Sequence, residues 1–300
     1  MHFNSKEEII ALTPLWKGER FEDGRPRVPD KYLKAMQKMT LEELWKPIFV
    51  KGYIQQFEGD LHTLHDDGRK LIGRAVTATY VPTRPDLFDI CMETGAAEQR
   101  KGTFNQWVID SLTDGDVAVI DMYDKIYKGT FVGGNLTTAI KKRTGNGGAI
   151  IWGGIRDVEQ MKKVPDVQVY YRGIDPTPIR EFCIKDFNSI TRIGKATVLP
   201  GDVVFGAGGG VLFIPSHLVQ EVVDGAAKTH VKDDFGFEAI TAGKFTTAQI
   251  DKNTWSEEML DLLMDWIRTD PRGEPYRDLD WSHEYDLARN GDPNDTQSAL

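Results

Sequence analysis

The chain is poor in cysteine and shows no export signal. Only two cysteines occur among 300 residues, Cys91 and Cys183, each alone in an apolar setting. One disulfide is compatible with that number, but two buried free thiols in a reducing compartment are the expectation. The first ten residues, MHFNSKEEII, lack the charged and then apolar regions of a secretory signal. We therefore expect a cytoplasmic protein.

The chain also lacks an excess of positive charge and any long apolar run. It holds 37 basic and 46 acidic residues, a formal net charge of −9. Such a chain repels a phosphate backbone at long range, and nucleic acid is not expected as a direct ligand. The apolar runs are far shorter than the roughly 20 residues that cross a bilayer, which excludes a transmembrane helix.

The pattern of residues predicts an α/β core between two extensions. From 71 to 245, short β-rich runs alternate with helical stretches, which is typical of α/β domains. Two of these runs follow similar turns, Gly115-Asp116 and Gly201-Asp202. We expect an N-terminal helical extension over 1–70 and a C-terminal helix and tail over 246–300.

Each extension contains a capping box, in which a Thr side chain and a Glu three residues later cap the start of a helix. The first pair is Thr40 and Glu43, and the second is Thr254 and Glu257. An apolar stripe at helical spacing follows the second pair and predicts a docking face. The last 30 residues are rich in Asp, Pro, Arg and Asn, and they predict an irregular tail.

Residues 133–157, GGNLTTAIKKRTGNGGAIIWGGIRD, are the most informative stretch. Gly133-Gly134 permits a tight turn, and Asn135 is a suitable N-cap for a short helix. Ala149–Trp152 then predicts a buried strand, followed by a bend that presents Arg156 and Asp157.

These residues form a candidate site for a small organic anion. The first free amides of the helix, at Leu136, Thr137 and Thr138, suit a carboxylate. Arg156 can clamp a carboxylate through two parallel hydrogen bonds, and Asp157 can hold a hard divalent cation. A purely structural helix start and a surface ion pair would give the same sequence, so the residues alone leave both interpretations open.

The motif Gly134-Asn135-Leu136, followed by Gly-Gly-Ile-Arg-Asp, resembles the signature of the RraA-like family. That family includes 4-hydroxy-4-methyl-2-oxoglutarate and 4-carboxy-4-hydroxy-2-oxoadipate aldolases and the regulator of ribonuclease activity A. Asn135 stands 21 positions before Arg156, which matches the spacing of the acidic residue and Arg-Asp in the aldolases. The similarity extends over roughly 71–245.

The resemblance implies a swivelling β/β/α fold, a homotrimer or hexamer, and sites between neighbouring subunits. It also implies Mg²⁺ or Mn²⁺ held by Asp157, a pyruvoyl group held by Arg156, and substrate contacts at Gly134, Leu136 and Thr137. The implied reaction is class II aldol cleavage of a small hydroxy-oxo carboxylic acid through a metal-stabilised enolate. Two alternatives remain open: a sugar-acid dehydratase or other enolate-forming lyase, and a non-catalytic regulator that binds a protein.

One residue departs from the aldolase pattern. Several aldolases have Asp where this chain has Asn135, and an amide cannot relay a proton. In the aldolases a second acidic group comes from the C-terminal helix of a neighbouring subunit. A loose alignment points to Asp233, with His230 and Asp234 nearby, although Asp233 also fits a solvated helix residue.

Three further segments were candidates for the site. His62 and His65 could bind a metal or act as an acid/base pair, but the spacing is that of no zinc framework. Arg172 begins a loop rich in proline, which we expect to be rigid, and it is a candidate substrate contact. Gly206–Gly210 resembles a phosphate cradle but lacks the lysine of a P-loop, and it predicts a tight β-turn.

Overall fold

The computed structural model describes residues 5–291, which form parts of two compact units, Met1–Glu221 and Val222–Leu300. The limits that the sequence predicts for the central domain, 71 and 245, stay a prediction. Both cysteines are free and buried, as expected.

The first unit contains seven helices, one 3₁₀ turn and eleven strands among its described residues. The helices are α1 (Lys6–Leu12), α2 (Asp30–Met36), α3 (Leu41–Val50), α4 (Pro85–Ala97), α5 (Phe104–Ser111), α6 (Gly134–Thr144) and α7 (Val158–Met161), with η1 at Ser216–Leu218. The strands are β1 (Phe57–Glu58), β2 (His62–Thr63), β3 (Leu71–Pro82), β4 (Asp116–Val132), β5 (Gly148–Ile155), β6 (Gln168–Ile174), β7 (Phe182–Phe187), β8 (Thr191–Ile193), β9 (Ala196–Val198), β10 (Val203–Ala207) and β11 (Gly210–Ile214). Each β-rich run of the sequence lies within one of these strands or extends one residue past one of its ends; the runs are 75–81, 117–121, 149–152, 167–171, 196–199 and 211–214.

Nine strands form one mixed sheet in the order β1-β11-β10-β3-β4-β5-β6-β2, with β7 paired to β3 beyond this path. The neighbours β3, β4, β5 and β6 run parallel, and the other pairs are antiparallel. β8 and β9 form a separate two-stranded sheet. The glycines between β10 and β11 form the tight hairpin turn that the sequence predicts.

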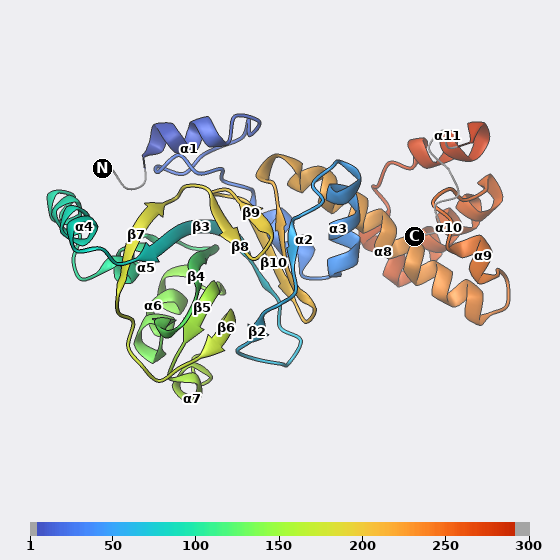
Figure 1. Cartoon of the computed structure of the whole chain (residues 1–300). Coiled ribbons are helices and arrows are strands. Elements are labelled where there is room, and N and C mark those ends of the chain that lie inside the picture. The colour runs from blue at the N-terminus through green and yellow to red at the C-terminus, as the bar shows by residue number, and fades with distance from the viewer. Residues whose placement is uncertain (1–4, 292–300) are drawn as a thin grey trace. The chain divides into compact units, whose positions relative to one another are not determined.

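Figure 1 shows three layers, namely helices α5 and α6, the large sheet, and the β8–β9 sheet. The alternation of side chains along β4 explains this order. Ala118, Ile120 and Met122 face the side on which α5 and α6 pack. Val117 and Val119 face the opposite side, which is covered by the β8–β9 sheet. Successive residues of a strand point to opposite faces, so a run that is buried throughout implies cover on both sides. The result is the β/β/α order that the resemblance predicts.

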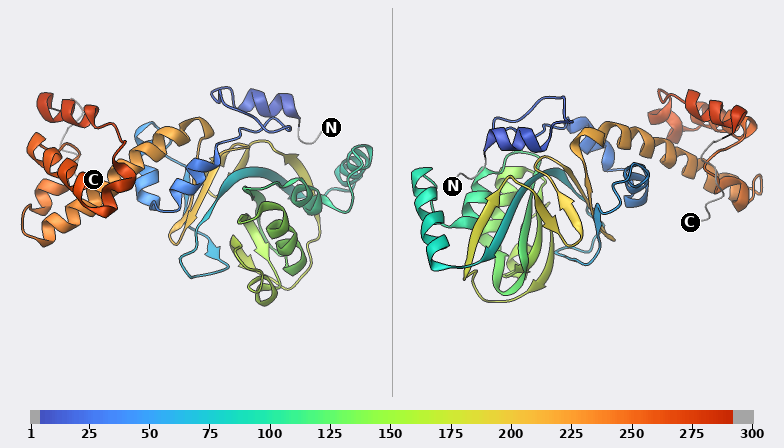
Figure 2. Two further views of the ribbon diagram at one scale, coloured as in Figure 1. Left: turned by 180° about the vertical axis from the view of Figure 1, so that it is seen from behind. Right: turned by 45° about the horizontal axis from the view of Figure 1, so that its top comes forward.

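The N-terminal segment is fastened to this core by a buried ion pair. Figure 2 shows α1 and the chain after it on the side of the strands opposite α7. Arg25 donates to both carboxylate oxygens of Asp116, at 2.8 and 3.1 Å, and also to Asp23 at 2.6 Å. Arg25 and Asp116 are 1% and 0% exposed, so each needs the other as a counter-charge.

The second Gly-Asp turn, Gly201-Asp202, also leads the chain into a strand, but the carboxyl group of Asp202 has a different electrostatic environment from that of Asp116. Asp202 accepts hydrogen bonds from the amides of Leu199 and Ser216, at 2.9 and 3.3 Å. No cation among the described residues pairs with it, and only 4% of it is exposed. Burial therefore raises the pKa of Asp202 to about 7.

This pKa predicts a dependence of stability on pH. Between about pH 4 and pH 7 the folded protein keeps a proton on Asp202 that the unfolded chain has lost, so this group makes the protein less stable as pH rises. Asp202→Asn removes the titration. Measured by urea unfolding, the free energy of unfolding of the variant should rise relative to the native protein as pH increases. Between about pH 4 and pH 7 this difference in the free energy of unfolding should grow by about 4 kcal/mol, because a tenfold change in proton affinity is worth about 1.4 kcal/mol. Unfolding curves whose difference is the same at every pH would contradict the assignment.

The second unit is helical in its described part. It contains most of α8 (Val219–Thr241), then α9 (Thr247–Ile250), α10 (Glu257–Thr269), η2 (Pro271–Tyr276) and α11 (Ser282–Asn290). The predicted apolar stripe of α10 is buried, and it packs with Val231, Phe235 and Trp255. Nowhere between residues 5 and 291 does a helix combine the length and apolar character that crossing a membrane requires.

Two expectations for the C-terminal extension were wrong. The N-cap of α10 is Ser256, whose hydroxyl accepts from the amide of Met259, so Thr254 does not cap this helix. The hydroxyl of Thr254 is instead buried without a hydrogen-bond partner. Part of the expected irregular tail is regular structure, since η2 and α11 lie there, and its last residues, 292–300, lie outside the described residues.

Candidate functional site

The candidate site lies where two neighbouring parallel strands end. β4 ends at Val132 and leads through Gly133 into α6, while β5 ends at Ile155 and leads into Arg156 and Asp157. Val132 and Ile155 are register partners, and the amide of Arg156 donates to the carbonyl of Val132 at 3.1 Å. The sheet therefore brings together the two sequence features that are 21 positions apart. Ligand sites in open α/β sheets form at such carboxyl ends.

The start of α6 differs from the prediction by two residues. Gly133, and not Asn135, is the N-cap, and Gly134 is the first helical residue. The amide of Thr137 donates to the carbonyl of Gly133 at 3.0 Å, so it is not free. The amide of Gly134 donates to the carboxylate of Asp157 at 3.4 Å, so the amides that α6 leaves for a ligand are those of Asn135 and Leu136.

Asp157 lies directly beside this helix start. Its Oδ2 atom is 3.4 Å from the amide nitrogen of Gly134 and 3.8 Å from Nε of Arg156. The Asp157 backbone is left-handed, with φ 56° and ψ 36°, a conformation that Asp and Asn tolerate better than other side chains. The side chains of Arg156 and Asp157 are 39% and 35% exposed, so both remain accessible to a ligand.

A cavity of about 120 Å³ opens at this place. Four of its lining residues, Asn135, Leu136, Arg156 and Asp157, are ones that the sequence singles out. Other lining residues were not predicted as site residues, namely Asn105, Thr130, Gln160, Pro178 and Ile179. Pro178 is the last residue of the predicted rigid loop, and Ile179 follows it directly. Nothing in the local sequence indicates Asn105, which α5 brings to the cavity.

Hydrogen bonds hold that loop against the end of β4. Thr177 accepts from the amide of Lys128 at 2.8 Å, and its own carbonyl accepts from the hydroxyl of Thr130 at 2.5 Å. Asp175 accepts from the amide and the hydroxyl of Thr177, and these bonds lower the pKa of Asp175. The loop therefore forms a fixed wall of the cavity.

Gly133 is required because the Asp157 carboxylate occupies the space of a side chain. A Cβ added at Gly133 would lie 2.3 Å from Oδ2 of Asp157. The other close contact is also with a side chain, Cγ of Arg156 at 3.1 Å, so Gly133→Ala should fold normally but displace the carboxylate. A displacement of about 1 Å can cost about 10²-fold in rate. We expect a 10- to 100-fold loss in kcat/KM for the reaction proposed below.

The matched control for this prediction is Gly208→Ala, because a Cβ there meets nothing within 4 Å. Circular dichroism of both variants should match the native protein. Full activity in Gly133→Ala would show that the position of Asp157 does not matter.

The donor atoms at the site fit a hydrated hard cation. Among residues 5–291, no three His, Cys, Asp or Glu side chains gather in a group that could hold a metal ion. Mg²⁺ usually keeps several waters and takes one or two carboxylates together with oxygens of the substrate. The accessible carboxylate of Asp157 supplies one such ligand.

Several predicted site residues lie elsewhere. Arg172 does not line the cavity; it pairs with Asp60 at 2.7 Å and Asp124 at 3.0 Å and lies over the ring of Trp152. The side chain of Thr137 is buried, with its hydroxyl unpaired.

The remaining candidates are also outside the cavity lining. His62 is an exposed residue of β2, and the main chain of His65 bonds to the side-chain amide of Gln168. Burial lowers the pKa of His65. Asp233 is on α8, in the second unit.

Comparison with known proteins gives a family match and several relatives. The family model described as RraA-like, Aldolase/RraA, matches residues 48–213. Protein DlpA of Legionella pneumophila is 28% identical over 177 residues, which are 59% of this chain and 26% of that protein. A protein of Halalkalibacterium halodurans named as a 4-hydroxy-4-methyl-2-oxoglutarate aldolase is 27% identical over 127 residues, 42% of this chain and 59% of that protein. The chain thus spans less than two thirds of either curated relative.

Solved structures show the same fold at low identity. A protein from Pseudomonas syringae pv. tomato is 20% identical with a TM-score of 0.61, and the match covers 78% of this chain and 97% of that one. Streptomyces coelicolor RraAS2, described as an unusual member of the RNase ES inhibitor RraA family, is 21% identical with a TM-score of 0.59. That match covers 73% of this chain and 98% of RraAS2.

Proposed function

The chain belongs to the RraA-like family, and from that premise we propose that it is a divalent-metal-dependent lyase of the aldolase type. Its substrate would be a small hydroxy-oxo carboxylic acid. The observation that carries this proposal is the position of the Asp157 carboxylate, which lies beside the first amide of α6 and next to Arg156 in an open cavity.

The residues of the cavity suit the two ends of such a substrate. Arg156 would bind a carboxylate through its planar guanidinium and would stabilise the negative charge that develops on the oxo group. The free amides of Asn135 and Leu136 would hold a second oxygen anion at the positive end of the helix dipole. Pro178 and Ile179 would exclude water from one side of the bound acid.

The cofactor would be Mg²⁺ or Mn²⁺, with Asp157 as its ligand from this part of the chain. When bound, the ion would polarise the 2-oxo group of the acid. A small cavity with a single carboxylate ligand is consistent with a site that a neighbouring subunit completes, so we propose a homotrimer or hexamer to which Asp233 contributes. The two free thiols fit a cytoplasmic location.

The direct experiment is an assay of pyruvate release from racemic 4-hydroxy-4-methyl-2-oxoglutarate, with Mg²⁺ or Mn²⁺. We expect turnover that EDTA abolishes and that either ion restores. The absence of pyruvate with both ions would refute the aldolase. Sedimentation of the native chain should show three or six subunits, and a monomer would refute the shared site.

Asn135 favours a second candidate, a dehydratase or another enolate-forming lyase that acts on a related acid. Asn135 lines the cavity at the position where several aldolases carry Asp, and its amide can orient water but cannot accept a proton. Loss of water from a panel of sugar acids, dependent on the metal and without pyruvate release, would support this reaction. A chain that turns over neither substrate class and instead captures a protein would be a regulator.

A further inference from the structure

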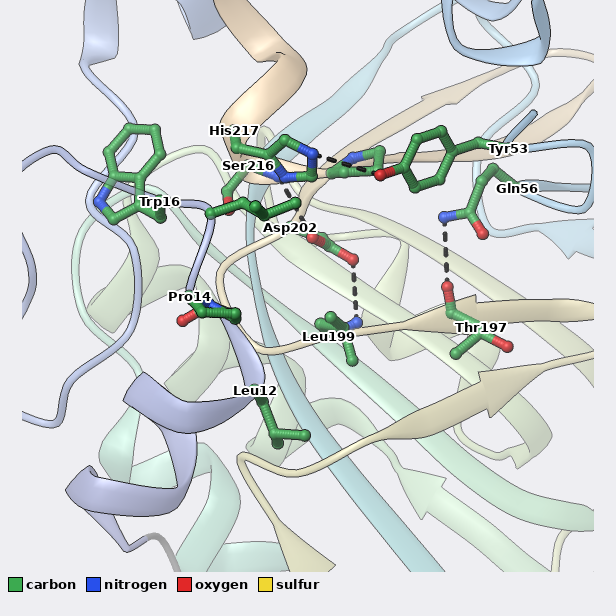
Figure 3. Close-up of a pocket in the computed structure, with 13 residues that line it drawn as sticks. Leu12, Pro14, Trp16, Tyr53, Gln56, Thr197, Leu199, Asp202, Ser216 and His217 are labelled. Atoms are coloured by element: carbon green, nitrogen blue, oxygen red, sulfur yellow. Dashed lines mark hydrogen bonds between the residues drawn. The ribbon is translucent and has the colours of Figure 1, made fainter. Parts of the chain in front are cut away.

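The first unit contains a second and larger cavity, of about 470 Å³. It shares no lining residue with the cavity at Asp157. Figure 3 shows side chains from four separate parts of the chain around it. The lining residues are Leu12, Thr13, Pro14, Leu15, Trp16, Tyr53, Gln56, Thr197, Leu199, Asp202, Pro215, Ser216 and His217. Small-molecule sites typically measure about 300–1,000 Å³, so the volume is sufficient for a ligand.

One wall of this cavity is held in place by Arg20. Its guanidinium donates to the hydroxyl and the carbonyl of Thr13, both at 2.8 Å, and to the carbonyl of Trp16 at 3.3 Å. The indole of Trp16 donates to the carbonyl of Glu19 at 2.8 Å. The segment Leu12–Trp16 is therefore fixed without a ligand, which lowers the entropy cost of binding.

Most polar groups around the cavity already have partners. Both carboxyl oxygens of Asp202 accept from backbone amides, and Gln56 donates to the carbonyls of Thr197 and Phe213. Tyr53 and His217 point toward one another, with Oη and Nε2 3.2 Å apart. A phenol oxygen can both donate and accept, so the Tyr53–His217 pair keeps capacity for one more hydrogen bond.

The charge of the lining selects against anions. Among the described residues that line it there is no Lys or Arg, and the one acidic side chain, Asp202, is 4% exposed and bound by two amides. Burial lowers the pKa of His217, which favours the neutral ring. Two nearby cations lie outside the lining and are engaged, Lys51 with Glu221 at 2.9 Å and Arg20 with Thr13 and Trp16. An anion in the cavity would therefore lack a direct counter-charge, and desolvation would cost it several kcal/mol.

We propose that this cavity is a second binding site, for a neutral and mainly apolar small molecule with one hydrogen-bonding group directed at Tyr53 and His217. Leu12, Pro14 and Trp16 would cover the apolar part of such a molecule. The site takes a class of ligand different from the acid that we propose as substrate.

The test uses two fluorescent probes with the same aromatic skeleton and the full-length protein. N-phenyl-1-naphthylamine is neutral, and 1-anilinonaphthalene-8-sulfonate adds one negative charge. We expect the neutral probe to bind saturably, one molecule per chain, and the anionic probe to bind at least tenfold more weakly. Equal binding of both probes, or no saturable binding of the neutral one, would overturn the proposal.

Variants at exposed positions locate the bound probe. Thr197→Trp puts a large side chain at a lining position and should abolish binding. It keeps the hydrogen bond from Gln56, which goes to the main-chain oxygen of Thr197. Leu15→Asp should weaken binding at least tenfold. Ile54→Asp is the matched control, because Ile54 is 62% exposed and Leu15 60%, but Ile54 does not line the cavity. Binding that all three variants leave unchanged would place the probe elsewhere and refute the site.

Discussion

Asp157→Asn should lower pyruvate release by at least about 10³-fold while the protein keeps its fold. The amide removes the negative charge beside Arg156 and the helix start, and with it the only carboxylate that lines the cavity among residues 5–291. A loss of this size corresponds to about 4 kcal/mol of transition-state stabilisation, within what a metal ion contributes. Asn is the right replacement because it tolerates the left-handed backbone of residue 157, where Ala would add strain.

Asp166→Asn is the matched control for that variant. Asp166 also has a left-handed backbone, with φ 51°, but does not line the cavity. The assay is steady-state kinetics with saturating Mg²⁺, together with circular dichroism of all three proteins. If Asp157→Asn retained more than a tenth of native kcat/KM, Asp157 would have no role in metal-dependent chemistry.

Arg25→Leu should destabilise the protein by about 3–5 kcal/mol, because it leaves the buried carboxylate of Asp116 without its counter-charge. Asp116 would keep the hydrogen bonds from Thr113, but these do not replace a bidentate guanidinium. The measurement is urea unfolding at neutral pH, followed by tryptophan fluorescence.

Arg27→Leu is the control for this second variant. Arg25 and Arg27 both lie over the ring of Phe21, but Arg27 is 51% exposed and its partner Glu19 is 69% exposed. An exposed pair of this kind contributes at most about 1 kcal/mol. Equal destabilisation by the two variants would show that the buried pair does not fasten the N-terminal segment.

The strands of the core were predictable because they are buried on both faces. The run 117–120 is apolar throughout, which is typical of a strand covered on both sides. The order of the nine strands was not predictable in this way, because pairings such as β7 with β3 depend on contacts far apart in the chain.

The candidate site was predictable where the chain itself brings residues together. Gly133 and Arg156 follow two neighbouring strands, so their proximity comes from one β-α-β unit. The helix start was misplaced, because a glycine N-cap is chosen here by the space that Asp157 needs and not by capping propensity. Asn105 was not predictable, because only the tertiary packing of α5 brings it to the cavity. There the side-chain amide of Asn105 donates to the carbonyl of Phe131.

The most direct test of the account is a titration of the native chain with Mn²⁺, followed by electron paramagnetic resonance of the free ion. We predict one bound ion per chain, affinity at least tenfold weaker in Asp157→Asn, and unchanged affinity in Asp166→Asn. If all three proteins bound Mn²⁺ equally, or none bound it, the carboxylate beside the start of α6 would not be a metal ligand, and the proposed lyase would be wrong.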